Sequence, residues 1–314
     1  MLYLVLGIIV VVIVLAVFIG AYVVYRMAFL RNDKIIGTPV EFPDTEFYTP
    51  YADEMTRNIK LFLDIPYEDV YIKSHDGLKL HGKFYKGEED KPVLIFFHGY
   101  RANATRDGSG IHTLGTVKGI NILVITQRAH NESEGKTITF GIKQSIDCLS
   151  WIDYVKERFG EEKKVILWGI SMGAATVLTA TGRNLPDNVL GVGADCGYCS
   201  AIDILKSVIK SMKLPVGISY WLVKMGAKIY GGFDVEETSP VEAVKKAKVP
   251  ILFIHGEADD FVPCYMTHEN YEACASDKRL VLVKDAGHGM SYYVDMKKVE
   301  EGVHAFLDKI MKEN

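Results

Sequence analysis

Apolar residues fill the start of the chain. Residues 2–25 contain no charged side chain, and only Gly7 and Gly20 fall outside the apolar types. As an α-helix, this run would span roughly 36 Å, which is enough to cross a hydrocarbon core of about 30 Å. No Lys or Arg precedes the run, and it is longer than the hydrophobic region of a secretory signal peptide. The pattern therefore predicts an uncleaved transmembrane anchor over residues 1–25.

Basic residues follow the apolar run but do not precede it. Arg26, Arg31 and Lys34 come after the run, with Asp33 among them. The positive-inside rule then places the body of the protein in the cytoplasm. Five cysteines, an odd number at low density, fit a reducing compartment better than a disulfide scaffold. We therefore expect a single-pass membrane protein with a cytoplasmic body.

Strand and helix patterns alternate along the rest of the chain. A proline-broken linker covers residues 26–67, within which residues 53–63 have the spacing of an amphipathic helix. Two strand patterns then flank an Asp76-Gly77 turn, which is typical of a hairpin. Continuous apolar runs, typical of strands buried on both faces, occur at residues 93–97, 120–125, 165–170, 189–194, 251–254 and 280–283. Helical spacing occurs at residues 140–158, from about 172, and at 295–312.

This alternation predicts an α/β fold over residues 68–314, with a mostly parallel twisted sheet and helices on both faces. The interval between Gly197 and Val249 has no strand pattern, and its two helical stretches indicate a small helical cap at about 198–248. The cap would shape a substrate pocket. Its candidate lining residues are Tyr220, Trp221, Leu222 and Phe233.

Composition narrows the class of protein. The chain has 314 residues, 48% of them hydrophobic, and a net charge of −4. Most of the excess hydrophobicity lies in the first 25 residues, so the remainder has the composition of an ordinary globular domain. Disorder, collagen, coiled coil and a multi-span membrane protein are excluded. The acidic balance gives no electrostatic case for nucleic-acid binding.

A candidate nucleophile lies between a buried strand and a helix. The sequence GISMG at residues 169–173 fits the pattern G-x-S-x-G, in which Ser171 occupies a sharp strand-to-helix turn between small neighbours. The helix that follows directs backbone N–H groups toward developing negative charge. A second N–H would come from the loop after residues 93–97, where HGY occupies residues 98–100. We therefore expect the N–H groups of Tyr100 and Met172 to form an oxyanion hole.

A serine hydroxyl needs a base and an orienting acid. His288 lies in the glycine-flanked loop AGHG after the last strand, and Asp259 lies in HGEADDFVP after the preceding strand. Both can reach the sheet edge that carries Ser171, and the chain order Ser171, Asp259, His288 is the one used in this strand–turn–helix setting. Asp260 and Asp195, which also follows a strand, stay open as alternative acids.

These blocks together resemble the α/β-hydrolase superfamily, in its serine-hydrolase branch. The resemblance covers roughly residues 68–312 and rests on HGY (98–100), QRAHNESEG (127–135), GISMG (169–173), HGEADDFVP (255–263) and AGHG (286–289). The second block resembles a structural D-x-R-G-H-G-x-S-x-G loop but departs from it at Gln127, Ala129 and Asn131. The spacing of Asp259 from His255 matches the family's H-G-x-x-D-x-x-V-P block and favours Asp259 as the acid.

The resemblance implies a serine hydrolase that acts on a small-molecule, lipid or acyl ester or thioester. A serine peptidase of the same fold and a non-catalytic membrane-tethered binding module are the alternatives. Cys196 and Cys199 form a C-x-x-C pair without a second ligand pair, so packing is favoured over a redox or metal role. No phosphate-binding loop is present, so we expect no cofactor and no metal. The sequence does not identify the substrate-binding residues.

Overall fold

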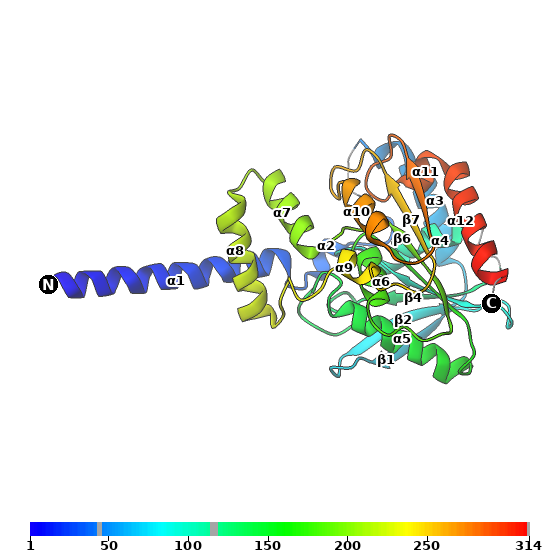
Figure 1. The fold of residues 1–314 in the computed structure, drawn as a ribbon, viewed down its shortest axis with the longest axis horizontal. Helices are drawn as coiled ribbons and strands as arrows, with labels where there is room; N and C mark the ends of the chain where they lie inside the picture. Colours follow the sequence, from blue (N-terminus) through cyan, green and yellow to red (C-terminus); the bar gives the residue numbers. More distant parts are fainter. Residues whose placement is uncertain (43–45, 114–118, 313–314) are drawn as a thin grey trace.

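The computed structural model describes residues 1–42, 46–113 and 119–312. Its centre is an eight-stranded sheet with the strand order β1-β2-β4-β3-β5-β6-β7-β8 (Figure 1). The first two strands, β1 (Glu68–Lys73) and β2 (Lys79–Tyr85), form the expected antiparallel hairpin, and β2 pairs antiparallel with β4. The other strands run parallel: β3 (Val93–Phe97), β4 (Asn121–Thr126), β5 (Val165–Ile170), β6 (Val189–Asp195), β7 (Ile251–Gly256) and β8 (Lys278–Val283).

Helices cover both faces of this sheet, so the predicted fold class is confirmed. Alternate residues of β3 point to opposite faces: Ile95 and Phe97 pack against α5 (Gln144–Phe159) and α6 (Met172–Thr181). Leu94 and Phe96 pack in the other layer. That layer contains α3 (Ala52–Leu63), α4 (Ala104–Thr113) and α12 (Met296–Lys312). Apolar side chains on both faces of each strand explain why the runs read as continuous rather than alternating.

Several boundaries differ from the sequence pattern. The helix expected from residue 140 begins at Gln144, because Phe140 and Gly141 adopt positive φ angles of 50° and 84° that an α-helix does not accommodate. The sequence pattern did not indicate α4, α10 (Tyr265–Ala273) or three short helices. These are α2 (Asp33–Ile36), η1 (Thr49–Tyr51) and α11 (Ser291–Val294).

The N-terminal helix α1 (Leu2–Ala28) extends away from the body (Figure 1). Within the described chain, it is the one helix long and apolar enough to cross a membrane, and its most apolar stretch has no buried residue. Its last turns are different, because Ala21 and Tyr25 are buried and Phe29 follows them into the protein. The Tyr25 hydroxyl lies 2.9 Å from the Thr137 hydroxyl. The end of the apolar helix is therefore part of the folded body.

The cap consists of α7 (Ala201–Ser211), α8 (Val216–Gly226), the π-helical turn η2 (Ala227–Gly231) and α9 (Pro240–Val244). Figure 1 shows α7 and α8 side by side, with α8 lying across α1. The two helices approach closely at Gly226, where an added Cβ would lie 2.6 Å from the Ala21 carbonyl oxygen. A glycine at this position therefore allows α8 to rest on α1.

Candidate active site

Ser171 occupies the turn between β5 and α6. Its φ of 54° and ψ of −117° lie in a region that non-glycine residues rarely adopt, as in a strained nucleophile turn. The turn packs tightly: a Cβ on Gly173 would lie 1.9 Å from the Phe97 carbonyl oxygen, and one on Gly169 would lie 2.2 Å from the Gly173 backbone. Only glycines fit at both positions, which accounts for the sequence GISMG.

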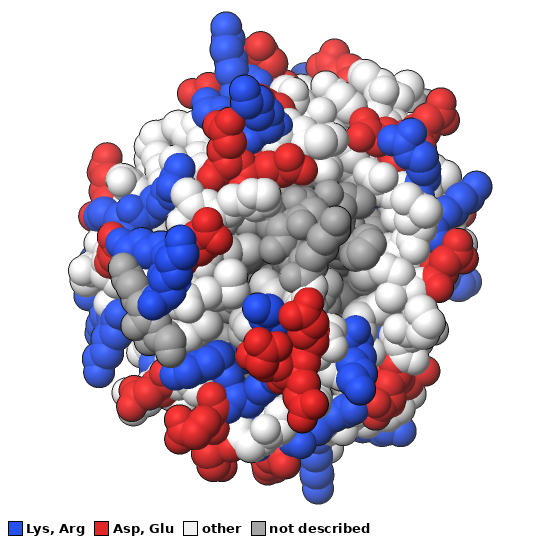
Figure 2. Space-filling view, turned by 90° about the vertical axis from the view of Figure 1, so that its right-hand side faces the viewer, with Lys and Arg blue, Asp and Glu red and all other residues white. Residues whose placement is uncertain are grey.

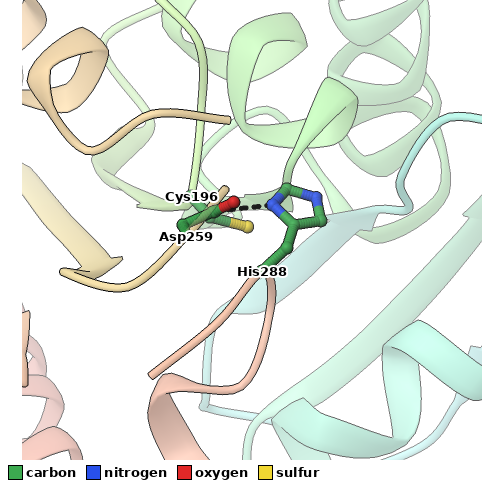
Figure 3. A group of neighbouring side chains, drawn as sticks. All are labelled: Cys196, Asp259 and His288. Atoms are coloured by element: carbon green, nitrogen blue, oxygen red, sulfur yellow. Dashed lines mark hydrogen bonds and ion pairs between the residues drawn. The ribbon is translucent and has the colours of Figure 1, made fainter. Parts of the chain in front are cut away.

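Ser171, His288 and Asp259 lie in hydrogen-bond contact in that order. His288 Nε2 lies 2.9 Å from Ser171 Oγ, and His288 Nδ1 lies 2.7 Å from Asp259 Oδ2. Figure 3 shows the His288 ring joined to the Asp259 carboxylate. Asp259 follows β7 and His288 follows β8, so neighbouring strand ends deliver both side chains to the edge that carries Ser171. The structure thus brings together the three residues that the motifs single out.

The Asp259 carboxylate is buried and firmly held. Its Oδ1 accepts hydrogen bonds from the N–H groups of Phe261 and Val262, at 3.0 and 2.8 Å. Burial raises the pKa of Asp259, but interactions with His255 and His288 outweigh burial and hold that pKa well below its usual value. The carboxylate is therefore ionised and favours the His288 tautomer with its proton on Nδ1. This tautomer leaves Nε2 free to accept the proton of a serine hydroxyl.

His255 supports this acid, and sequence reasoning used it only as a motif position. Its Nε2 lies 3.2 Å from Asp259 Oδ2 and 2.8 Å from the Val262 carbonyl oxygen, and its Nδ1 lies 2.6 Å from the Thr267 hydroxyl. The ring is completely buried. His255 therefore ties β7 to the loop that carries the acid.

The two alternative acids take other positions. Asp260 is exposed, and neither it nor Asp195 has a hydrogen bond to His288 among the described contacts. Asp195 ends β6 below Ser171, whose N–H donates to the Asp195 carbonyl oxygen at 2.8 Å. Its Oδ1 is buried without a hydrogen-bond partner among the described residues, and burial raises the pKa of Asp195 to about 6. The geometry therefore favours Asp259.

The candidate oxyanion-hole donors lie beside the nucleophile. Met172 is the first residue of α6, and Tyr100 lines the same cavity as Ser171. Neither backbone N–H has a hydrogen-bond acceptor in the part of the chain that the structure describes. The loop that carries Tyr100 approaches closely, since a Cβ on Gly99 would lie 3.6 Å from Ser171 Cβ. Both N–H groups are therefore available to a substrate oxygen.

His98 is a structural residue in this loop. Its ring is fully buried, which lowers the pKa of His98 to about 4 and keeps the ring neutral. Its Nε2 accepts the N–H of Gln127 at 3.0 Å, and its Nδ1 donates to the Gly99 carbonyl oxygen at 2.7 Å. Ala129 and Asn131 adopt positive φ angles of 63° and 33°, so this loop keeps left-handed conformations where the resembling motif has glycines.

Cys196 lies next to the Asp259–His288 pair (Figure 3). Its thiol and one ligand atom of each partner lie within 4.8 Å of one another. Burial raises the pKa of Cys196 far above its usual value, and burial likewise raises that of Cys199, which contacts Asp203. Both thiols are therefore protonated, whereas metal binding and nucleophilic attack require a thiolate. All five cysteines are free, and the chemistry favours packing for this pair.

A cavity of about 650 Å³ opens onto Ser171 and His288. Its walls do not come from the cap: the expected lining by Tyr220, Trp221, Leu222 and Phe233 is wrong. Tyr220 and Phe233 are buried in a cluster with Tyr25 and Phe29, and Leu222 lies beside Gly20 of α1, where an added Cβ would be 3.5 Å away. Trp221 is 45% exposed. The physical reason is that the cap uses its apolar side chains to rest on α1.

The segment at residues 26–67, which we expected to be a linker and entry segment, builds much of the cavity wall. Apolar lining residues from this segment are Ile35, Ile36, Phe42, Met55 and Ile59. Two aromatic contacts attach the segment to the loop of the base: the Tyr48 hydroxyl donates to the His288 carbonyl oxygen at 3.0 Å, and Phe47 packs so closely on Gly287 that a Cβ there would lie 2.5 Å away. The region before the first strand thus belongs to the site.

The comparisons agree with this architecture. The sequence model of the prolyl oligopeptidase family matches residues 139–314, more than half of the chain. The chain is 27% identical over 240 residues to YqkD of Bacillus subtilis, covering 76% of this chain and 78% of that protein. It is 24% identical over 246 residues to the alpha/beta hydrolase domain-containing protein WAV2 of Arabidopsis thaliana, covering 76% and 77%.

Among solved structures, the Pyrococcus furiosus esterase PF2001 has a TM-score of 0.63 and 24% identity, covering 79% of this chain and 92% of that chain. This likeness shows the α/β-hydrolase fold. Together with the family match, it identifies a hydrolase: the chain belongs to the prolyl oligopeptidase family.

Proposed function

We propose that the protein is a membrane-anchored serine hydrolase that cleaves carboxylic ester or thioester bonds. The observation that carries the proposal is the hydrogen-bonded series from Ser171 through His288 to Asp259, of which Ser171 and His288 line a cavity. A series of this kind makes an ordinarily weak hydroxyl nucleophilic at neutral pH.

The reaction would proceed in two halves. Ser171 Oγ attacks the substrate carbonyl carbon while His288 Nε2 takes the hydroxyl proton, and the N–H groups of Tyr100 and Met172 donate to the resulting oxyanion. His288 then gives the proton to the leaving alcohol or thiol, which leaves an acyl-enzyme on Ser171. Water, deprotonated by His288, attacks this acyl group and releases the acid. Each oxyanion donor contributes on the order of 10²- to 10³-fold to such a reaction.

The cavity supports an acyl substrate. Most of its wall is apolar, with Ile35, Ile59 and Trp168 among the lining residues, and its volume lies in the range that holds a small ligand. The family name makes a serine peptidase the second candidate. A panel of p-nitrophenyl esters from acetate to palmitate, beside a blocked peptide p-nitroanilide, would separate the two. Faster turnover of the peptide than of every ester would reject the ester assignment.

A fluorophosphonate probe tests the catalytic proposal directly. We expect the full chain to be labelled, and we expect Ser171→Ala to remain unlabelled. Ser211→Ala is a suitable control, because Ser211 is exposed at the end of α7 and does not line the cavity. A wild-type chain that resists labelling, or a Ser171→Ala variant that labels equally, would instead support the non-catalytic membrane-tethered binding module.

We further propose that α1 anchors the protein as a single span, with the catalytic body in the cytoplasm. The length and exposure of α1 and the basic residues after it support this arrangement. The test is a Lys297→Cys variant in a Cys264→Ser background, treated in intact cells with a membrane-impermeant maleimide. Lys297 is exposed on α12, far from α1. Labelling only after permeabilisation is expected, and labelling of intact cells would reverse the orientation.

A further inference from the structure

Helix α8 has two apolar sides, of which only one is covered by protein, and its polar residues are Ser219 and Lys224, which pairs with Glu236. Its inward residues Tyr220, Val223 and Gly226 are buried. Its outward side is also apolar, and the exposed large side chains on α8 and its flanks are Met212 (49%), Leu214 (46%), Ile218 (63%), Trp221 (45%) and Ile229 (43%). A cluster of large apolar side chains that the protein itself leaves exposed marks a contact with another protein or with a membrane. The outward side therefore needs an apolar partner.

The position of α8 on α1 identifies that partner. The Leu222 side chain lies beside Gly20, since a Cβ added there would be 3.5 Å from it. The Tyr230 hydroxyl donates to the Phe18 carbonyl oxygen at 3.1 Å, and the ring of Tyr230 lies 5.1 Å from that of Tyr22. With a rise of about 1.5 Å per residue, about 20 residues of α1 fill a hydrocarbon core of about 30 Å. The contacts at residues 18–22 therefore lie where an anchor that starts near Leu2 leaves the hydrocarbon.

The orientation and the charges of the cap fit the same surface. Figure 1 shows α8 lying across α1, so a membrane crossed by α1 would run along α8. Four exposed lysines flank the apolar side: Lys206, Lys210, Lys213 and Lys228. None of these four has an ion pair within the described chain, whereas the fifth lysine of this region, Lys224, pairs with Glu236. Asp203 is the one acidic residue between positions 200 and 232. Lysines beside an apolar helix face favour anionic lipid headgroups.

The opposite face of the molecule has a different character. In Figure 2, which views the side away from the N-terminus of α1, acidic and basic side chains are interspersed over the visible described surface. Mixed charge of this kind suits contact with water. The apolar side of α8, with its four lysines that lack an ion pair among the described residues, is thus on the side of the anchor.

We propose that the outward face of α8 is a second membrane contact, which lies in the interface of an anionic bilayer beside the anchor. Met212, Leu214, Ile218, Trp221 and Ile229 would enter the headgroup–acyl boundary to a depth of about 5–10 Å. Two contacts, α1 and α8, fix the rotation of the body about the anchor, which a single helix does not. The proposal rests on the membrane anchor of the proposed function.

Tryptophan fluorescence gives a direct test. The chain has three tryptophans, of which Trp151 and Trp168 are buried in the core and Trp221 is exposed on α8. The full chain would be reconstituted into vesicles of phosphatidylcholine and phosphatidylglycerol, with or without brominated acyl chains. We expect bromine to quench part of the emission, and we expect Trp221→Phe to lose this quenching. Equal quenching in both proteins, or none in either, would overturn the proposal.

The same samples distinguish the other outcomes. Flotation with the vesicles after a carbonate wash reports the anchor, so a chain that floats but shows no quenching of Trp221 overturns only the α8 contact. Protection of Trp221 from acrylamide without quenching by bromine would show that protein, such as a second copy, covers α8, and would reject the lipid.

Charge reversal tests whether the lysines of the cap bind anionic lipid. Lys210→Glu combined with Lys213→Glu should remove the extra quenching that phosphatidylglycerol causes, whereas Lys297→Glu combined with Lys298→Glu on α12 should keep it. Quenching that is independent of phosphatidylglycerol in the wild-type chain would contradict the role of the lysines.

Discussion

Asp195→Asn should stabilise the protein at alkaline pH. Asp195 ends β6 and lines the cavity, its Oδ1 has no hydrogen-bond partner among the described residues, and burial raises the pKa of Asp195 to about 6 from its usual value of 3.8. His255 and His288 lower this pKa and Asp259 raises it further, but burial has the largest effect. Above about pH 6, Asp195 is therefore ionised in a buried site that favours its neutral form.

Proton linkage gives the direction in which stability changes with pH. Because the folded protein holds the Asp195 proton more tightly than the unfolded chain, the stabilising contribution is complete below about pH 3.8 and is lost as the pH rises through about 6. The full loss is up to about 3 kcal/mol, of which about 2 kcal/mol falls between about pH 4.5 and pH 8. An asparagine at this position cannot ionise, so the variant avoids this loss.

Urea unfolding of the full chain in detergent, followed by tryptophan fluorescence, measures the effect. We expect the free energy of unfolding of Asp195→Asn, relative to wild type, to increase by about 2 kcal/mol between about pH 4.5 and pH 8. Asp260→Asn is the matched control, because Asp260 is exposed. A relative stability of Asp195→Asn that stays constant over this pH range would refute the reasoning.

Three further predictions concern the site. Asp259→Asn should lower kcat for an ester by about 10³- to 10⁴-fold, because the amide favours the wrong tautomer of the base, and a loss below tenfold would count against the proposed acid. Gly173→Ala should lower kcat at least about 100-fold, because its Cβ would lie 1.9 Å from a carbonyl oxygen that ends β3. Gly217→Ala, with nothing within 4 Å, should leave kcat unchanged, and equal kcat values in the two variants would contradict the steric argument. Tyr100→Phe removes the 2.8 Å hydrogen bond from the Tyr100 hydroxyl to the Ala28 carbonyl oxygen. The variant should lose about 1 kcal/mol of stability, and its kcat should fall a few-fold at unchanged KM. Thermal unfolding identical to wild type would reject a stabilising role for this hydrogen bond.

Local patterns predicted the central sheet well. The runs at residues 93–97 and 165–170 coincide with β3 and β5, because a strand buried on both faces needs apolar residues at every position. The candidate nucleophile, base and acid could also be predicted from the sequence, since each follows a recognisable strand in a short motif. Their hydrogen-bond contact is a consequence of parallel strands ending at one edge.

Contacts between segments that are distant in the chain could not be predicted from the sequence. The sequence indicates that residues 53–63 form an amphipathic helix, but not that Met55 and Ile59 face the cavity. Trp221 and Leu222 were predicted to line a pocket because they are apolar residues of the cap. The spacing of apolar residues does not show that the surface on which the cap packs is α1. Helix α4 was not predicted, because Ile111 is its only large apolar residue and no helical spacing of apolar residues results.

The last turns of α1 bear on how a soluble form of this enzyme should be made. Phe29 is fully buried, with its ring 5.6 Å from that of Phe140 and 5.3 Å from that of Phe233, and Tyr25 is nearly as buried. Cutting the chain after residue 25, where the apolar run ends, would remove the buried Ala21 and Tyr25, break the contact of Tyr25 with Thr137, and leave Phe29 near a new chain end. The working boundary between anchor and enzyme therefore lies inside the helix, before Ala21, so a useful truncation has to keep a stub of membrane helix.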